Sequence, residues 1–180
     1  MPTKACFPTP DAVLWQVLEW EPSCKQIEQF ITLQTQLKKW NKLMNLTRLS
    51  EGDDYWISQV VDSLWPIKSE LKNPKRPRKC IDIGTGCGFP GLAIAIALPG
   101  AELSLIDSVR KKTNALCEMV ASVGIESRVK VFTERVEVTG HNPLFRGRYD
   151  LAMARAVAKA PVVAEYLIPL LKPNGEAILF

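Results

Sequence analysis

A glycine-rich stretch, CIDIGTGCGFPG at residues 80–91, constrains the fold of this chain more than any other segment. It begins with an apolar run that contains one aspartate, and four glycines then follow within eight residues. Because glycine adopts backbone conformations that other residues avoid, this spacing predicts a strand, a tight turn and a helix. A turn without bulky side chains lets a ligand approach the backbone closely. We therefore expect a nucleotide-like cofactor here, since four glycines that bound nothing would only weaken the fold.

The residues around the glycines distinguish two classes of cofactor. GTGCG at residues 84–88 resembles a loop for S-adenosyl-L-methionine, whereas GCGFPG at residues 86–91 matches the dinucleotide fingerprint. Asp82 suits the ammonium group of a methionine moiety and would repel a pyrophosphate. Pro90 lacks the backbone N–H that a pyrophosphate needs at the start of the helix. These two residues favour S-adenosyl-L-methionine, with Gly84 and Gly86 in the loop beside it.

Strand and helix patterns alternate after residue 79. The expected strands are 80–83, 102–107, 129–133, 149–154 and 176–180, and the expected helices are 91–98, 110–123 and 160–171. This alternation predicts a parallel sheet with right-handed crossovers and helices on both faces. Together with the glycine loop it predicts an α/β fold, the Rossmann-like class I fold of S-adenosylmethionine-dependent methyltransferases. Asp107 ends the second strand, where a carboxylate accepts hydrogen bonds from ribose hydroxyls in both cofactor classes.

The first part of the chain is expected to be helical. Apolar residues recur every three or four positions between residues 24 and 44, Ser23 is a suitable N-cap, and flanking helices are expected at 12–20 and from about 54 to Pro66. We divide the chain into a helical region with a basic linker, residues 1–74, and a Rossmann-like methyltransferase domain, residues 75–180. The chain ends inside the expected fifth strand, so we expect the final strands of the sheet to be missing.

Composition excludes several classes of protein. The 180 residues carry a formal net charge of +4, with 47% hydrophobic and 23% charged residues, as in a soluble globular protein. No basic lead with a long apolar core begins the chain, and no apolar run approaches the roughly 20 residues that span a bilayer. The five cysteines include no C-x-x-C pair, so we expect neither a metal site nor disulfides. We expect a cytoplasmic monomer that does not bind membranes.

The residues that the chain lacks indicate the methyl acceptor. Methylation of a hydroxyl usually needs a base, and the one histidine, His141, lies in a loop, GHNPL, typical of a solvated surface. The segment after the fourth strand, LAMARAVAKAP, has neither the Asn/Asp-Pro-Pro-aromatic turn that meets exocyclic amines nor a nucleophilic cysteine. An acceptor with a lone pair and no proton, such as N7 of guanine, fits best.

Basic residues suggest a nucleic-acid substrate. Six of them fall between Lys68 and Lys79, opposed in sequence only by Glu70, and others lie at 38–48 and at 110–112. A clustered patch matters for phosphate binding more than the total charge does. The alternative interpretation of the segment 72–79 is a solvated linker.

Several motifs together resemble one known family. WNKLMNLT at residues 40–47, DSL at 62–64, DIGTGCGFPG at 82–91, LIDS at 105–108, RVE at 135–137 and ARA at 154–156 are similar to motifs of the glucose-inhibited division protein B family, the bacterial 16S ribosomal RNA guanine-N7 methyltransferases. The match covers most of the chain. Where the family usually has a basic residue and a histidine before the DS pair, this chain has Ser58 and Gln59.

The resemblance implies roles for particular residues. Gly84 and Phe89 would line the cofactor, and Val136 with Glu137 would bind the adenine, with Glu134 as a rival carboxylate. Arg155 would lie near the cofactor and the incoming guanine, or form a structural ion pair with a carboxylate such as Asp82.

The implied function is S-adenosyl-L-methionine-dependent methylation of guanine N7 in 16S rRNA of the small ribosomal subunit. No catalytic residue is assigned apart from Arg155. Three alternatives stay open: a methyltransferase for a small molecule, a nicotinamide-dependent oxidoreductase, and a non-catalytic remnant that binds RNA or nucleosides.

Overall fold

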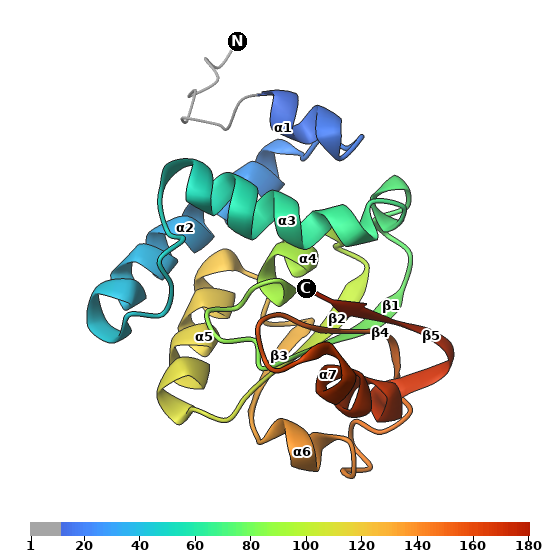
Figure 1. Cartoon of the computed structure of the whole chain (residues 1–180). Helices are drawn as coiled ribbons and strands as arrows, with labels where there is room; N and C mark the ends of the chain where they lie inside the picture. Colours follow the sequence, from blue (N-terminus) through green and yellow to red (C-terminus); the bar gives the residue numbers. More distant parts are fainter. Residues whose placement is uncertain (1–11) are drawn as a thin grey trace.

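The computed structural model describes residues 12–180 and contains one layer of strands between helices (Figure 1). Expectations for the first residues, including Cys6 and the absence of a secretory signal, lie outside the described residues. The strands are β1 (Arg78–Ile83), β2 (Ala101–Asp107), β3 (Val129–Thr133), β4 (Tyr149–Ala154) and β5 (Leu171–Leu179). All pairings are parallel, in the order β3-β2-β1-β4-β5. The predicted α/β fold with a parallel sheet is confirmed.

The strand order fixes where a ligand can bind. After β1, strands β2 and β3 are added on one side of β1. The chain then crosses back, and β4 and β5 are added on the other side of β1. The connections on the two sides of β1 therefore diverge at its carboxyl end, next to β4. In open parallel sheets this divergence leaves a crevice outside the carboxyl ends of the strands, where ligands bind. The glycine loop follows β1 and lies at this crevice.

Helices cover both faces of the sheet. They are α4 (Gly91–Ala97), α5 (Arg110–Val123), α6 (Val136–Thr139) and α7 (Ala160–Leu167), and a 3-10 turn, Ile168–Leu170, follows α7. The expected helix 160–171 is thus too long. Pro169 has no N–H to donate and its ring clashes with the preceding turn, so the α-helix stops before it.

The fifth strand is longer than expected. It runs from Leu171 instead of residue 176, and its pairing with β4 is irregular between Tyr149 and Leu151. The sequence there, Pro173-Asn174-Gly175, has turn chemistry, and Asn174 has a φ of 64°. In the register with β4, Leu171 pairs with Tyr149 and Glu176 pairs with Leu151, so residues 172–175 form a bulge without partners on β4. Regular pairing begins at Glu176, where the sequence predicts the strand.

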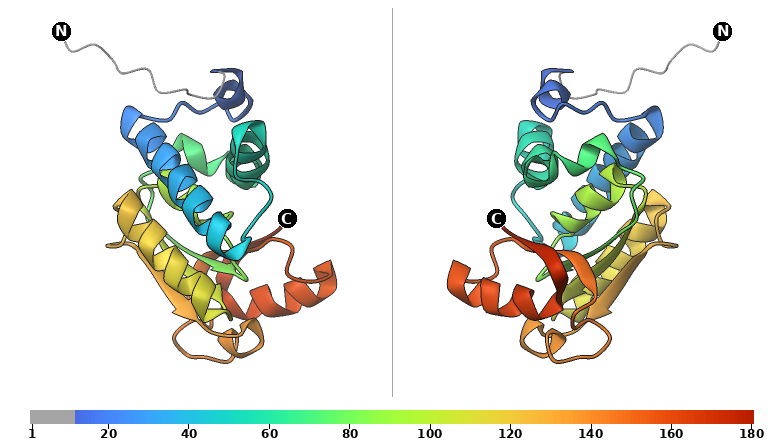
Figure 2. Two further views of the ribbon diagram at one scale, coloured as in Figure 1. Left: turned by 90° about the vertical axis from the view of Figure 1, so that its left-hand side faces the viewer. Right: turned by 90° about the vertical axis from the view of Figure 1, so that its right-hand side faces the viewer.

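The N-terminal helices pack on the face of the sheet that α4 and α5 cover. They are α1 (Ala12–Val17), α2 (Cys24–Met44), a π-helix at Asp54–Val61, α3 (Asp62–Leu64) and 3-10 turns at Trp65–Ile67 and Glu70–Lys72. Figure 2 shows α2 alongside α5. The Ser23 side chain accepts from Gln26 N, and the Gln26 side chain accepts from Ser23 N, so the expected N-cap is part of a capping box.

One hydrophobic core joins the N-terminal helices to the sheet. Phe30, Leu33 and Tyr55 are fully buried in the same cluster as Leu92 of α4 and Leu105 of β2. The Tyr55 hydroxyl donates to the Phe30 carbonyl oxygen over 2.7 Å. A second core fills the opposite face, under α7, with Ile81 and Ile83 of β1 among its members. The N-terminal helices therefore bury their apolar faces against the sheet domain, which fixes their position next to the glycine loop.

Candidate active site

The loop between β1 and α4 has an unusual backbone. Gly84, Gly86 and Gly88 have φ values of 65°, 58° and 98°, in the left-handed region that glycine favours. A Cβ on Gly84 would lie 2.5 Å from Cγ2 of Val157, so the neighbouring turn leaves no room for a side chain there. A Cβ on Gly86 would meet nothing closer than 3.8 Å. The loop therefore needs glycine at 84 for two reasons and at 86 for one.

Asp82 supports this loop from below. Its Oδ2 accepts from the Thr85 hydroxyl over 2.7 Å and from the Gly91 backbone N–H over 2.9 Å. The side chain is fully buried, and among the described residues no group donates to its Oδ1. Burial raises the pKa of this carboxyl to about 7, while the two hydrogen bonds act in the opposite direction. An ammonium group at Oδ1 would satisfy the unpaired oxygen, and this direct contact stays a prediction.

Asp107 holds the other side of the loop. Its Oδ2 accepts from the Gly86 N–H over 3.0 Å, and its Oδ1 accepts from the Val109 N–H over 2.9 Å. These two bonds aim the carboxylate at the crevice between β2 and the loop. The carboxylate also lines a cavity there, so it is placed to meet a ligand as well as the backbone.

Four predicted site residues line one small cavity, which we call the Glu137 cavity. Its volume is about 170 Å³, and its lining is Gly84, Asp107, Ser108, Arg135, Val136, Glu137 and Val157. The bare backbone of Gly84 and two carboxylates thus converge from the ends of β1, β2 and β3. The rival Glu134 instead accepts from the Asn142 side chain over 3.3 Å and does not line this cavity. The donor and acceptor groups fit a nucleoside.

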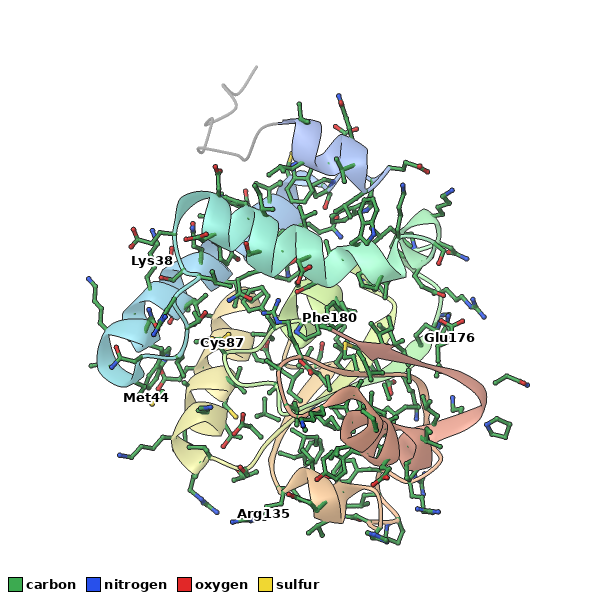
Figure 3. All side chains as sticks on the ribbon, in the orientation of Figure 1. Lys38, Met44, Cys87, Arg135, Glu176 and Phe180 are labelled. Carbon is green, nitrogen blue, oxygen red and sulfur yellow. The ribbon has the colours of Figure 1, made fainter. Side chains whose placement is uncertain are left out.

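A larger cavity, which we call the Arg155 cavity, lies on the other side of the loop. Its volume is about 550 Å³, and its lining is Thr47, Leu49, Ile57, Ser58, Gln59, Asp62, Cys87, Arg155 and Ala156. The π-helix and the loop after α2 form most of its wall. Figure 3 places Cys87, which lines the Arg155 cavity, towards the N-terminal helices, and Arg135, which lines the Glu137 cavity, towards α6.

Arg155 is held by the π-helix. Its guanidinium donates to the Ser58 carbonyl oxygen over 3.2 Å and to the Gln59 side-chain oxygen, and it lies 3.5 Å from the Asp62 carboxylate. The ion-pair partner is therefore Asp62, and the expected pairing with Asp82 is wrong, because Asp82 instead accepts hydrogen bonds from Thr85 and Gly91. The Phe89 ring is buried below the Arg155 guanidinium, 5.9 Å from it, and does not line either cavity.

The turn at residues 155–157 separates the two cavities, and we call this turn the dividing wall. Arg155 and Ala156 face one cavity and Val157 lines the other. Ala156 has a φ of 55°, which non-glycine residues rarely adopt. Strained residues of this kind persist where the surrounding structure holds them, often at functional sites. A group bound in the Glu137 cavity and a group bound in the Arg155 cavity would therefore both lie next to this turn and next to the glycine loop.

Comparisons with known proteins identify the family. The family model for rRNA small subunit methyltransferase G, GidB, matches residues 26–180. The chain belongs to this family. It is 62% identical over 180 residues to the ribosomal RNA small subunit methyltransferase G of Prochlorococcus marinus (strain MIT 9313), covering 100% of this chain and 73% of the relative. It is 63% identical over 172 residues to the same-named protein of Synechococcus sp. (strain CC9902), covering 96% and 71%.

Solved structures share the fold at low sequence identity. The O-methyltransferase from Bacillus cereus in complex with SAH superposes with a TM-score of 0.61 at 15% identity, covering 82% of this chain and 64% of that one. A SAM-dependent methyltransferase from Thiobacillus denitrificans in complex with S-adenosyl-L-homocysteine gives 0.51 at 17%, covering 66% and 47%. These likenesses show the class I methyltransferase fold that the sequence predicts.

Sequence reasoning missed most of the Arg155 cavity. Asp62 and Cys87 stand inside family motifs, and Gln59 departs from the family pattern, but none of the three indicates a cavity by itself. The one available signal was the polar pair Ser58-Gln59 inside an otherwise apolar helical stretch. Among residues 12–180, no cluster of three histidine, cysteine or acidic side chains could hold a metal ion. In that same range no helix is both long and apolar enough to cross a membrane.

Replacing Gly84 and Gly86 separates backbone strain from crowding. Both alanine variants place a side chain at positive φ, which costs about 1–2 kcal/mol. Gly84→Ala also forces its Cβ against Val157, so we expect a further loss of about 1–3 kcal/mol. Denaturant unfolding of both variants measures the difference, and equal losses would show that Val157 leaves room at Gly84.

The pH dependence of stability reports on Asp82. The folded state raises the pKa of Asp82 to about 7 from its ordinary value of 3.8, so the folded state binds the proton more tightly than the unfolded chain does. The stability from Asp82 is therefore present below about pH 4 and declines as the pH rises to about 7, by about 1.4 kcal/mol per pH unit. In Asp82→Asn this decline is absent. Unfolding free energies of the two proteins between pH 4.5 and 8 should converge or cross, and parallel curves would contradict the raised pKa.

Proposed function

We propose that this chain transfers a methyl group from S-adenosyl-L-methionine to N7 of a guanine in 16S rRNA of the small ribosomal subunit. The observation that carries the proposal is the pair of cavities on either side of the glycine loop, in a chain that matches the family model over residues 26–180. One cavity has the groups that a nucleoside needs, and the other is large enough for a base. We further propose that the protein works in the cytoplasm as a monomer.

The residues of the Glu137 cavity fit the cofactor. Asp107 would accept from the ribose hydroxyls, and Glu137 with the backbone at Val136 would bind the adenine. The bare backbone at Gly84 and Gly86 leaves room for the methionine portion, whose ammonium group fits the unpaired Oδ1 of Asp82. When bound, the cofactor supplies an electrophilic methyl group. The protein's own part is to hold the donor at the dividing wall, facing the Arg155 cavity.

Among the described residues, the Arg155 cavity has no histidine in its lining that could act as a base, which fits a methyl acceptor that has no proton to lose. Guanine N7 carries a lone pair and no proton, so its methylation needs no general base. His141 does not line the Arg155 cavity, and it lies instead in a third cavity that shares Val136 and Glu137 with the Glu137 cavity. Alignment of donor and acceptor can then supply most of the rate, and such alignment is worth roughly 7–11 kcal/mol. Arg155, which lines the cavity named after it, is placed to orient the base.

The fold pairs five of the six cations in the basic segment, residues 68–79, with three carboxylates. Lys68 and Lys72 pair with Glu19 over 2.8 and 3.5 Å, Arg76 and Arg78 pair with Glu70, and Lys79 lies 3.8 Å from Glu102. This segment also leads into the amino end of β1, at the edge of the sheet opposite to the site. We therefore assign it no part in holding RNA.

Other cations surround the cavities. They are exposed, they form no salt bridge with another described residue, and they follow the carboxyl ends of the strands or adjoin the Arg155 cavity: Arg48, Arg110, Lys111, Arg135 and Lys159. We call this set the basic rim. Unpaired cations around a site keep their full attraction for phosphate. The rim is therefore the expected contact surface for the RNA backbone around the target guanine.

Methyl transfer from labelled S-adenosyl-L-methionine tests the proposed function. We expect label in 16S rRNA of unmodified small subunits, at guanine N7, and none in free nucleosides. Asp107→Ala removes the acceptor for the ribose and should weaken cofactor binding by about 10- to 100-fold, as expected for hydrogen bonds to a charged group. Label in a small molecule or in protein, but never in rRNA, would refute the substrate. Cofactor binding without any transfer would favour a non-catalytic remnant.

Salt dependence tests the basic rim. Arg48→Gln and Lys159→Gln should each reduce the slope of log kcat/KM against log salt by about 0.7–0.9, because each removes one phosphate contact. Lys75→Gln is the matched control, since Lys75 is exposed, forms no salt bridge with a described residue and lies in the linker before β1. An equal effect of all three substitutions would mean that only the total charge matters.

A further inference from the structure

Gln59 is a buried glutamine that joins three separate segments of the chain. Only 1% of it is exposed. Its side-chain Nε2 donates to the Thr47 hydroxyl over 3.1 Å and to the Cys87 sulfur at 3.9 Å, and its Oε1 accepts from Arg155. It therefore connects the loop after α2, the glycine loop and the turn after β4.

The orientation of the Gln59 amide follows from its partners. A guanidinium only donates hydrogen bonds, so the amide must present its oxygen to Arg155. The amide nitrogen then faces the Thr47 hydroxyl and the Cys87 sulfur, which can both accept. The Thr47 oxygen also accepts from the Leu49 N–H over 3.1 Å, which fixes the loop that carries it. If the Gln59 amide were reversed, its NH2 group would face the Arg155 guanidinium, and both groups only donate hydrogen bonds.

The π-helix brings two groups to Arg155 at once. Within Asp54–Val61 the backbone turns are wider than in an α-helix, and such turns are frequent at functional sites. The Ser58 carbonyl oxygen accepts from Nη1 of Arg155 over 3.2 Å, next to the bond from Gln59. The Ser63 hydroxyl in turn donates to the Gln59 carbonyl oxygen. The main chain around Gln59 is thus held independently of its side chain.

Arg155 keeps donors for a ligand after these contacts. Ser58, Gln59 and Asp62 engage three of the five N–H groups that an arginine carries. The remaining two belong to a side chain that lines the Arg155 cavity. Without Gln59 the guanidinium would still have an exposed partner, Asp62, whose side chain is 58% exposed. It could then swing towards solvent and away from the dividing wall.

We propose that Gln59 is a positioning residue, which holds the Arg155 guanidinium at the dividing wall so that its free donors meet the acceptor nucleotide. Through the Thr47 and Cys87 contacts, Gln59 also ties this position to the glycine loop that holds the methyl donor. The inference rests on the proposed function, because the acceptor is the nucleotide named there.

Gln59→Leu tests the contribution to catalysis. Removing the amide should lower kcat/KM for small ribosomal subunits by about 10- to 100-fold, the range for a hydrogen bond to a charged group. Affinity for the cofactor should change less than 3-fold, since Gln59 does not line the Glu137 cavity. The control is Gln29→Leu, because Gln29 donates to the Val123 carbonyl oxygen over 3.1 Å and lines neither cavity. Equal activity of both variants would overturn the proposal.

Gln59→His gives a readout that a structural role would not produce. A neutral imidazole keeps one acceptor and one donor, so this variant should retain activity within about 3-fold of the parent at pH 8. Burial and the Arg155 charge both disfavour the imidazolium, so the histidine stays neutral with its acceptor available to Arg155. A Gln59→His variant as impaired as Gln59→Leu would contradict the proposed contact.

A measurement without activity separates this inference from the proposed function. In NMR spectra the guanidinium N–H signals of Arg155 should be resolved in the parent and in Gln29→Leu, and lost in Gln59→Leu. If the parent labels no rRNA but these signals behave as expected, the substrate proposal fails and the role of Gln59 in holding Arg155 stands. If rRNA is labelled and the signals persist in Gln59→Leu, the role of Gln59 fails and the function stands.

Discussion

Two carboxylates on neighbouring strands hold the turn on which the rest of the site depends. Asp82 at the end of β1 binds Thr85 and the first N–H of α4, and Asp107 at the end of β2 binds the Gly86 N–H. The glycine backbone between them cannot support itself through side chains, since it has none. The acids therefore replace the contacts that glycine lacks. Asp107 also lines the Glu137 cavity, and Oδ1 of Asp82 has no hydrogen-bond partner among the described residues.

The N-terminal helices complete the site as well as the core. Their apolar residues merge with those of α4 and β2 in one cluster, so the π-helix is fixed against the glycine loop. Arg155 then meets a glutamine 96 positions earlier in the chain. The acceptor side of the site thus belongs to a helical region and a strand end that only the packed core brings together. A change in that core would move Gln59 relative to Arg155 without touching either residue.

The attraction of this protein for phosphate depends on where its basic residues lie more than on how many there are. The densest basic stretch of the chain is paired with Glu19, Glu70 and Glu102, which come from three different elements. The less conspicuous rim cations keep no such partners among residues 12–180. Salt bridges at exposed sites contribute little stability, yet they reduce the local charge that would otherwise attract phosphate. Under the proposed function, the RNA backbone is therefore expected at the carboxyl edge of the sheet.

Local sequence determined the parts of this protein that depend on near neighbours. The helices at 24–44 and 110–123 and the strands at 129–133 and 149–154 have the expected bounds, because side-chain periodicity and capping act within a few residues. The glycine spacing likewise required a turn against a ligand, and the family motifs named the enzyme class. Only the tertiary structure decided the length of β5, the partner of Arg155 and the residues that line its cavity. These features are set by contacts between distant segments, and such contacts form only when the two hydrophobic cores pack.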